Sequence, residues 1–139
     1  MEGFELEFDH FGLATRSPER AVAFLHGLGY RNQGPVYDPV QNVNLILCEN
    51  GSMPAVEVIS PADGTGPLDG VLSNCNEMLY HLCYRSRDVS ASLAAMRQAG
   101  LRVVQVSAPQ PAVIFGHKKV SFHMIKGFGL IEIIETDGS

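Results

Sequence analysis

The sequence has few of the residues that would mark a disulfide framework or a thiolate metal site. It contains no tryptophan and only three cysteines, Cys48, Cys75 and Cys83, none of them in CxxC spacing. An odd number of cysteines without paired spacing predicts reduced, mostly buried thiols. Since disulfides are rare in reducing compartments, we expect a cytoplasmic protein.

Basic clusters and long apolar runs are also missing. The chain has 10 Lys and Arg against 15 Asp and Glu, a formal net charge of −5, without a basic run. This balance argues against nucleic acid or an anionic membrane as the partner. No apolar stretch approaches the roughly 20 residues that span a bilayer. Residues 1–5 lack the basic and apolar regions of a secretion signal.

The composition that remains is that of an ordinary globular protein. Hydrophobic residues make up 45% of the 139 positions and charged residues 18%, so the chain is long and apolar enough to form a core. We predict a single domain over residues 1–139.

Two glutamates stand in the middle of apolar runs. Residues 129–135 read GLIEIIE around Glu132, and residues 54–59 read PAVEVI around Glu57. Such runs predict β-strands covered on both faces. A buried carboxylate is costly unless something pairs with it. Either each glutamate lies near a strand end and reaches water, or it has a partner.

The surroundings of the two glutamates repeat along the chain. His10 precedes a helix-capping residue by seven positions and a helix-ending glycine by nineteen, and His81 does the same. These capping residues and glycines are Ser17 and Gly29, then Asp88 and Gly100. From His10 to Glu57 there are 47 positions, and from His81 to Glu132 there are 51.

The repeat predicts a tandem duplication of a βαβββ unit and an α+β fold. Module one spans about residues 5–60, a linker with one short helical turn spans 61–76, and module two spans about 77–136. We expect the two modules to form a cupped, incompletely closed barrel around a metal cleft. The expected strands are residues 5–15, two within 30–50, 54–59, 78–84, 101–106, 120–125 and 130–134.

Repeat symmetry would place His10, Glu57, His81 and Glu132 at equivalent points of this cleft. Two imidazoles and two carboxylates suit Zn²⁺, Ni²⁺, Co²⁺, Fe²⁺ or Mn²⁺, and ligand type does not choose among them. Each histidine alone is also consistent with a core residue satisfied by a hydrogen bond. The set is also consistent with an ion-paired remnant that has lost its metal.

These features resemble the vicinal oxygen chelate (glyoxalase/bleomycin-resistance/dioxygenase) superfamily, nearest to methylmalonyl-CoA epimerase and glyoxalase I. The resemblance runs from about residue 8 to residue 135. Its carriers are DHFG at 9–12, VEV at 56–58, YHLCY at 80–84, the segment 111–122 and GLIE at 129–132.

The resemblance implies a metal-dependent lyase or isomerase with His10, Glu57, His81 and Glu132 as ligands, usually a homodimer. The expected reaction removes a proton next to a metal-bound carbonyl of a small molecule or thioester, with Glu132 as the base and Glu57 as the second candidate. The epimerases usually have Gln at the position of Glu57 and a further acid on the third strand. Residues 43–46 read VNLI, which argues against methylmalonyl-CoA as substrate.

Three further residues and two other functions belong to the hypothesis. His117 and Lys118 either bind a phosphate or carboxylate of the substrate or form a solvated turn, and His123 faces either the cleft or solvent. The first alternative function is a non-enzymatic drug-binding protein of the same fold, against which the complete ligand set argues. The second is an iron dioxygenase, against which Glu57 and the short chain argue.

Overall fold

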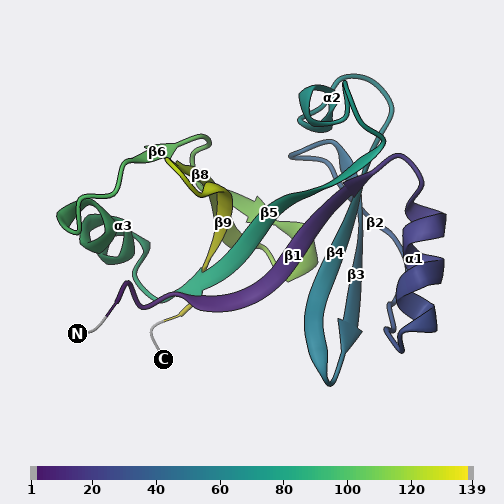
Figure 1. The fold of residues 1–139 in the computed structure, drawn as a ribbon, viewed down its shortest axis with the longest axis horizontal. Helices are drawn as coiled ribbons and strands as arrows, with labels where there is room; N and C mark the ends of the chain where they lie inside the picture. The colour runs from purple at the N-terminus through teal and green to yellow at the C-terminus, as the bar shows by residue number, and fades with distance from the viewer. Residues whose placement is uncertain (1–2, 138–139) are drawn as a thin grey trace. The chain divides into compact units, whose positions relative to one another are not determined.

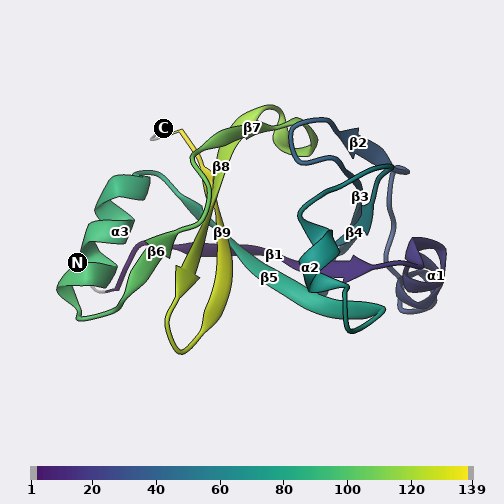
Figure 2. The same ribbon diagram turned by 90° about the horizontal axis from the view of Figure 1, so that it is seen from above.

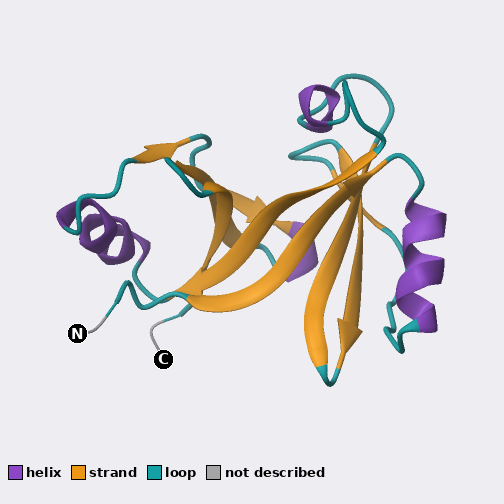
Figure 3. Cartoon of the chain, in the orientation of Figure 1, coloured by secondary structure: helices purple, strands orange, loops and turns teal. Residues whose placement is uncertain are grey.

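The computed structural model describes residues 3–137. Strands predominate and helices are few (Figure 3), so the α+β prediction is confirmed. The elements are, in order, β1 (Glu7–Thr15), α1 (Pro18–Gly27), β2 (Val36–Asp38), β3 (Val43–Asn50), β4 (Met53–Pro61), α2 (Leu68–Val71), β5 (Glu77–Ser86), α3 (Val89–Gln98), β6 (Val103–Gln105), β7 (Gln110–Ala112), the 3₁₀ turn η1 (Val113–Phe115), β8 (Lys118–Ile125) and β9 (Gly129–Glu135).

This order confirms the two βαβββ modules and the short helical turn between them. The second module carries one addition that the sequence did not predict, the short strand β7 followed by η1. The segment has a proline and no alternation of apolar and polar residues, so periodicity could not reveal it.

The described chain divides into two compact units. The first unit is residues 10–80, and the second combines residues 3–9 with residues 81–137. The boundaries fall inside β1 and β5, directly before His10 and His81. Each of the two histidines that the sequence suggests as metal ligands is therefore the first residue after a boundary.

In the first unit the strands are ordered β2-β3-β4-β1. β2, β3 and β4 are antiparallel neighbours, and β1 runs parallel to β4. Helix α1 lies beside these strands (Figure 1) and packs Leu25 against Cys48 and Val58. Tyr30, just after the helix, donates a hydrogen bond from its hydroxyl to the Pro54 carbonyl at 2.6 Å. Because successive side chains on a strand point to opposite faces, every second residue of β1 and β4 lies on the face away from α1.

In the second unit the strands are ordered β5-β9-β8-β6, with β7 paired to β8. β5 and β9 are parallel, and β8 is antiparallel to β9, β6 and β7. Helix α3 packs Leu93 and Met96 against Ile131 and Ile133 of β9. Figure 2 shows α3 with β6, β8 and β9 in this unit. The sheet is mixed and does not close into a barrel, as predicted.

The helix ends follow the sequence signals, with one exception. Gly29 (φ +96°) and Gly100 (φ +88°) adopt the left-handed conformation just after α1 and α3, where glycine avoids the Cβ penalty. Asp88 caps α3 by accepting a hydrogen bond from the Ala91 amide at 3.0 Å. Ser17 occupies the N-cap position of α1, but its side chain makes no capping hydrogen bond. None of the described helices combines the length and apolar character that a membrane crossing requires.

Candidate metal centre

The first unit places His10 and Glu57 on one face of two parallel neighbours, β1 and β4. In the ladder Gly12 is opposite Glu57. Side chains two positions apart on a strand share a face, and so do ladder partners. His10 therefore points to the same side as Glu57, away from the α1-covered side of Val58. The His10 Nε2 and Glu57 Oε1 atoms lie 3.5 Å apart, and these residues are 0% and 3% exposed.

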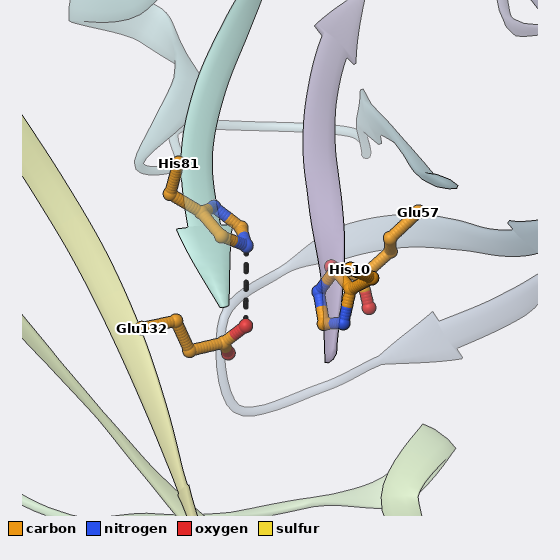
Figure 4. Close-up of side chains that lie close together, drawn as sticks. All are labelled: His10, Glu57, His81 and Glu132. Atoms are coloured by element: carbon orange, nitrogen blue, oxygen red, sulfur yellow. Dashed lines mark ion pairs between the residues drawn. The ribbon is translucent and has the colours of Figure 1, made fainter. Parts of the chain in front are cut away.

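The second unit repeats this arrangement with His81 and Glu132 on β5 and β9. Cys83 is opposite Glu132 in the ladder, and Ile131 and Ile133 face α3. The His81 Nε2 and Glu132 Oε1 atoms lie 3.1 Å apart (Figure 4), and both residues are 3% exposed. The pair therefore lies on the face turned away from the helix, as in the first unit.

The two His–Glu pairs occupy equivalent positions in the strand ladders of their modules. In each module the glutamate on the last strand stands opposite the position two residues after the histidine, which is Gly12 in one and Cys83 in the other. The repeat inferred from sequence spacing is thus also a repeat of strand register. Its asymmetry is chemical, because one glutamate has a glycine beside it and the other has a thiol.

An aromatic and aliphatic wall stands beside the His81–Glu132 pair. Phe122 is the ladder partner of Glu132 on β8, and its ring meets the His81 ring edge-on. Cys83, Val120 and Ile134 form a buried cluster on this face, joined by Ala112 of β7 and Phe115 of η1. The unpredicted β7–η1 segment therefore supplies part of this wall. In such apolar surroundings electrostatic interactions are stronger than in water.

The neighbourhood of Glu57 in the first unit is aliphatic on the β3 side. Leu47 is its ladder partner on β3, and Leu45 is the partner of Ile59 on the same face. β3 thus presents leucines to this face, in line with the absence of an acid at residues 43–46. A carboxylate from β3 does not accompany Glu57 here.

The three other candidate residues are placed differently. His123 is the ladder partner of Ile131 and is 1% exposed, so its side chain lies on the α3 side of the sheet, opposite to Glu132. Its Nε2 atom is 2.8 Å from the Ser121 hydroxyl. Burial, and secondarily the positive charge of Arg97, lower the pKa of His123. This placement does not support contact with a substrate held by Glu132.

His117 and Lys118 are exposed at the start of β8. His117 has φ +64°, and its amide donates to the Ala112 carbonyl at 2.9 Å, closing the turn around η1. Lys118 is an even number of residues from Phe122 and shares its face of β8. Substrate contact by His117 and Lys118 stays a prediction.

The residues of both pairs fit a divalent metal ion. They are buried imidazoles and carboxylates of the types that can coordinate such an ion, and within each pair an Nε2 atom faces an Oε1 atom. A mixed set of nitrogen and oxygen donors without thiolate suits Zn²⁺, Ni²⁺, Co²⁺, Fe²⁺ or Mn²⁺.

Solved structures of known proteins share this fold. A methylmalonyl-CoA epimerase from Mycobacterium tuberculosis is 21% identical, with a TM-score of 0.77 over 97% of this chain and 91% of that one. A hypothetical protein from Bacillus halodurans C-125 is 19% identical, with a TM-score of 0.76 over 96% of both chains. A Streptomyces coelicolor methylmalonyl-CoA epimerase variant in complex with 2-nitronate-propionyl-CoA is 17% identical, with a TM-score of 0.73 over 96% of this chain and 98% of that one. At these identities the likeness shows the fold alone.

Sequence comparison gives the family. A search of curated proteins finds no match. Residues 9–122 match the model of the Glyoxalase/Bleomycin resistance protein/Dioxygenase superfamily, a match that covers most of the chain and contains three of the four candidate ligands. The chain therefore belongs to the glyoxalase/bleomycin resistance protein/dioxygenase superfamily.

Proposed function

We propose that His10, Glu57, His81 and Glu132 together hold one divalent metal ion, and that the chain is a lyase or isomerase of the glyoxalase/epimerase type. The observation that carries this proposal is the register of the two His–Glu pairs, which is the same in both modules. Each copy of the duplicated unit has a buried imidazole and a buried carboxylate at equivalent positions. A fold of this kind is suited to bind one ligand with the residues of both copies.

The chemistry follows from the donor set and the buried carboxylates. The bound cation would stabilise negative charge that develops on a carbonyl oxygen of the substrate. Glu132 takes the proton from the neighbouring carbon and returns it to the product. Phe122 and the cluster of Cys83, Val120 and Ile134 exclude water from this carboxylate. Glu57 is the second candidate base.

The substrate we propose is a small molecule or thioester with an acidic C–H next to a carbonyl. Leu47 stands beside Glu57 where β3 could have offered a further acid. We therefore favour a reaction in which a single carboxylate, that of Glu132 or that of Glu57, removes the proton and also returns it. Thioester substrates remain included because methylmalonyl-CoA epimerases share the fold.

Metal analysis of the purified protein tests the proposal. We expect about one divalent ion per chain in the wild type and its loss in His81→Ala, with His26→Ala as the matched control on the exposed side of α1. Absence of stoichiometric metal in the wild type would instead support a non-enzymatic small-molecule binder. A redox-inactive metal with retained turnover would exclude a dioxygenase.

The role of Glu132 needs a separate measurement on an identified substrate. We expect Glu132→Gln to keep the fold and to lose at least about 100-fold in turnover, the usual contribution of a general base. Full turnover in that variant would rule out Glu132 as the base. A homodimer and a cytoplasmic location belong to the same proposal, and sedimentation and cell fractionation test them.

A further inference from the structure

The second unit has a cavity on the face of its sheet opposite to Glu132. Its volume is about 710 Å³, and it lies among the N-terminal segment, α3, β5 and the turn between β8 and β9. Ile131 lines this cavity, and the next residue, Glu132, points to the other side of the sheet. A molecule bound in the cavity would thus be separated from the His81–Glu132 pair by the thickness of the sheet.

The inner part of the cavity is lined by apolar side chains that pack in the core of this unit. Met96, Ile125 and Ile131 are buried members of one core cluster and line the cavity together. Phe4 and Leu6 of the N-terminal segment pack against the same cluster and form another side. The surrounding walls therefore come from separate segments that the core holds in place.

The rim of the cavity leaves large apolar side chains in contact with water. Phe128 is 60% exposed and Leu101 is 38% exposed, and both line the opening. The loop and the turn that carry them are joined by the backbone, because the Lys126 amide donates to the Arg102 carbonyl at 3.0 Å and the Phe128 amide to the Ile125 carbonyl at 2.9 Å. Backbone hydrogen bonds thus hold the rim in a conformation that exposes apolar surface to solvent, which costs free energy.

The charges around the cavity cancel. Lys126 and Glu5 both line it and do not form an ion pair with each other among the described residues. The remaining side chains of the lining are aliphatic or aromatic apart from the Tyr84 hydroxyl. The lining therefore offers neither charge sign an advantage and suits an uncharged ligand.

We propose that this cavity is a second binding site, for an uncharged, largely apolar small molecule. Its volume lies within the range of about 300–1,000 Å³ that is typical of small-molecule sites. Burying apolar surface of such a ligand against Phe128, Leu101 and Met96 removes apolar area from water on both sides. This site does not require the proposed metal or any residue of the two His–Glu pairs.

The test is a titration with 1-octanol, followed by ¹⁵N–¹H correlation spectra and calorimetry of the full chain. We expect saturable binding, with amide shifts concentrated at Phe4, Leu6, Met96 and Phe128. Octanoate and octylammonium serve as matched charged probes and should each bind more weakly than 1-octanol. Metal analysis on the same sample should give the same value with and without 1-octanol, so the two proposals fail independently.

Two matched variants decide the location. Leu101→Glu places a carboxylate at the rim and should weaken 1-octanol binding about tenfold, since desolvating a charge beside an apolar ligand is costly. Val104→Glu makes the same kind of change at a 50% exposed residue of β6 that does not line the cavity, and should leave binding within about twofold. Circular dichroism checks that both variants fold.

Three results would overturn the proposal. The first is the absence of saturable 1-octanol binding to the folded wild type, and the second is equal weakening by Leu101→Glu and Val104→Glu. The third is a concentration-dependent sedimentation mass that Leu101→Glu alone abolishes, because the rim would then be an interface between copies of the chain.

Discussion

The His81 ring stands edge-on to the Phe122 ring, with centroids 5.3 Å apart and planes at 81°. Phe122 is also the ladder partner of Glu132, so one aromatic side chain lies beside both members of the second His–Glu pair. Edge-to-face contact restrains the orientation of the imidazole. Packing, as well as chemistry, therefore sets where the His81 nitrogen atoms point.

Phe122→Leu should loosen this restraint while keeping the strand apolar. We expect metal affinity to fall by about 10-fold, since residues that orient a ligand commonly have effects of this size, with a stability loss of roughly 1 kcal/mol. Zinc titration and urea unfolding measure the two effects. Phe24→Leu on α1, where Phe24 is 68% exposed, is the control, and an equal loss of affinity there would contradict the prediction.

Metal binding should stabilise the folded protein. If Zn²⁺ binds the native state, stability rises by about 2.7 kcal/mol at a free concentration of about 100 times Kd, and EDTA removes this gain. Thermal unfolding with and without Zn²⁺ measures it. In His81→Ala the shift should largely vanish, whereas His26→Ala should keep it; a shift of full size in His81→Ala would place the metal elsewhere.

The two helix starts should respond differently to the same kind of truncation. Asp88→Ala removes a capping hydrogen bond to the Ala91 amide and should cost about 1 kcal/mol of unfolding free energy. Ser17→Ala removes no such bond and should cost only a few tenths of a kcal/mol. Chemical denaturation of both variants makes the comparison, and equal losses would show that the cap at Asp88 contributes little.

Stability should fall as the pH drops below 6.5 because of His123. Burial, then Arg97, lower its pKa from the ordinary value of 6.5. Between the lowered pKa and 6.5 the unfolded chain binds a proton that the folded chain does not, so stability is full above 6.5 and is lost as pH falls towards the folded value. His123→Gln can keep a hydrogen bond to Ser121 and should flatten this part of the curve. Urea unfolding between pH 5 and 8, on both sides of the ordinary pKa of 6.5, measures the free energy of unfolding of the wild type and of His123→Gln. If the two curves against pH are parallel, groups other than His123 cause the pH dependence.

Thiol labelling should separate the three cysteines. Cys75 is exposed, whereas Cys48 and Cys83 are buried. Burial also raises the pKa of Cys48, so less thiolate is available there. A thiol reagent should therefore modify the native protein first at Cys75, and mass spectrometry of digested samples identifies the site. Early modification of Cys48 would show that its strand opens in solution.

The sequence by itself determined the modular plan and the four candidate ligands. His10 and His81 recur at one distance from a capping residue and a helix-ending glycine, and each is followed by a glutamate in an apolar strand. Those signals are local, because spacing, turn chemistry and the period of apolar residues need only neighbours along the chain.

Only the tertiary structure decided which face each side chain occupies and what surrounds it. His123 could not be assigned from period two, because the residues on both sides of it in β8 are apolar or small; its pairing with Ile131 puts it under α3. The wall of Ala112 and Phe115 depends on β7, which is visible only through its pairing with β8. Register between strands far apart in sequence is set by burial over the whole fold, and that information is not contained in any single stretch of the chain.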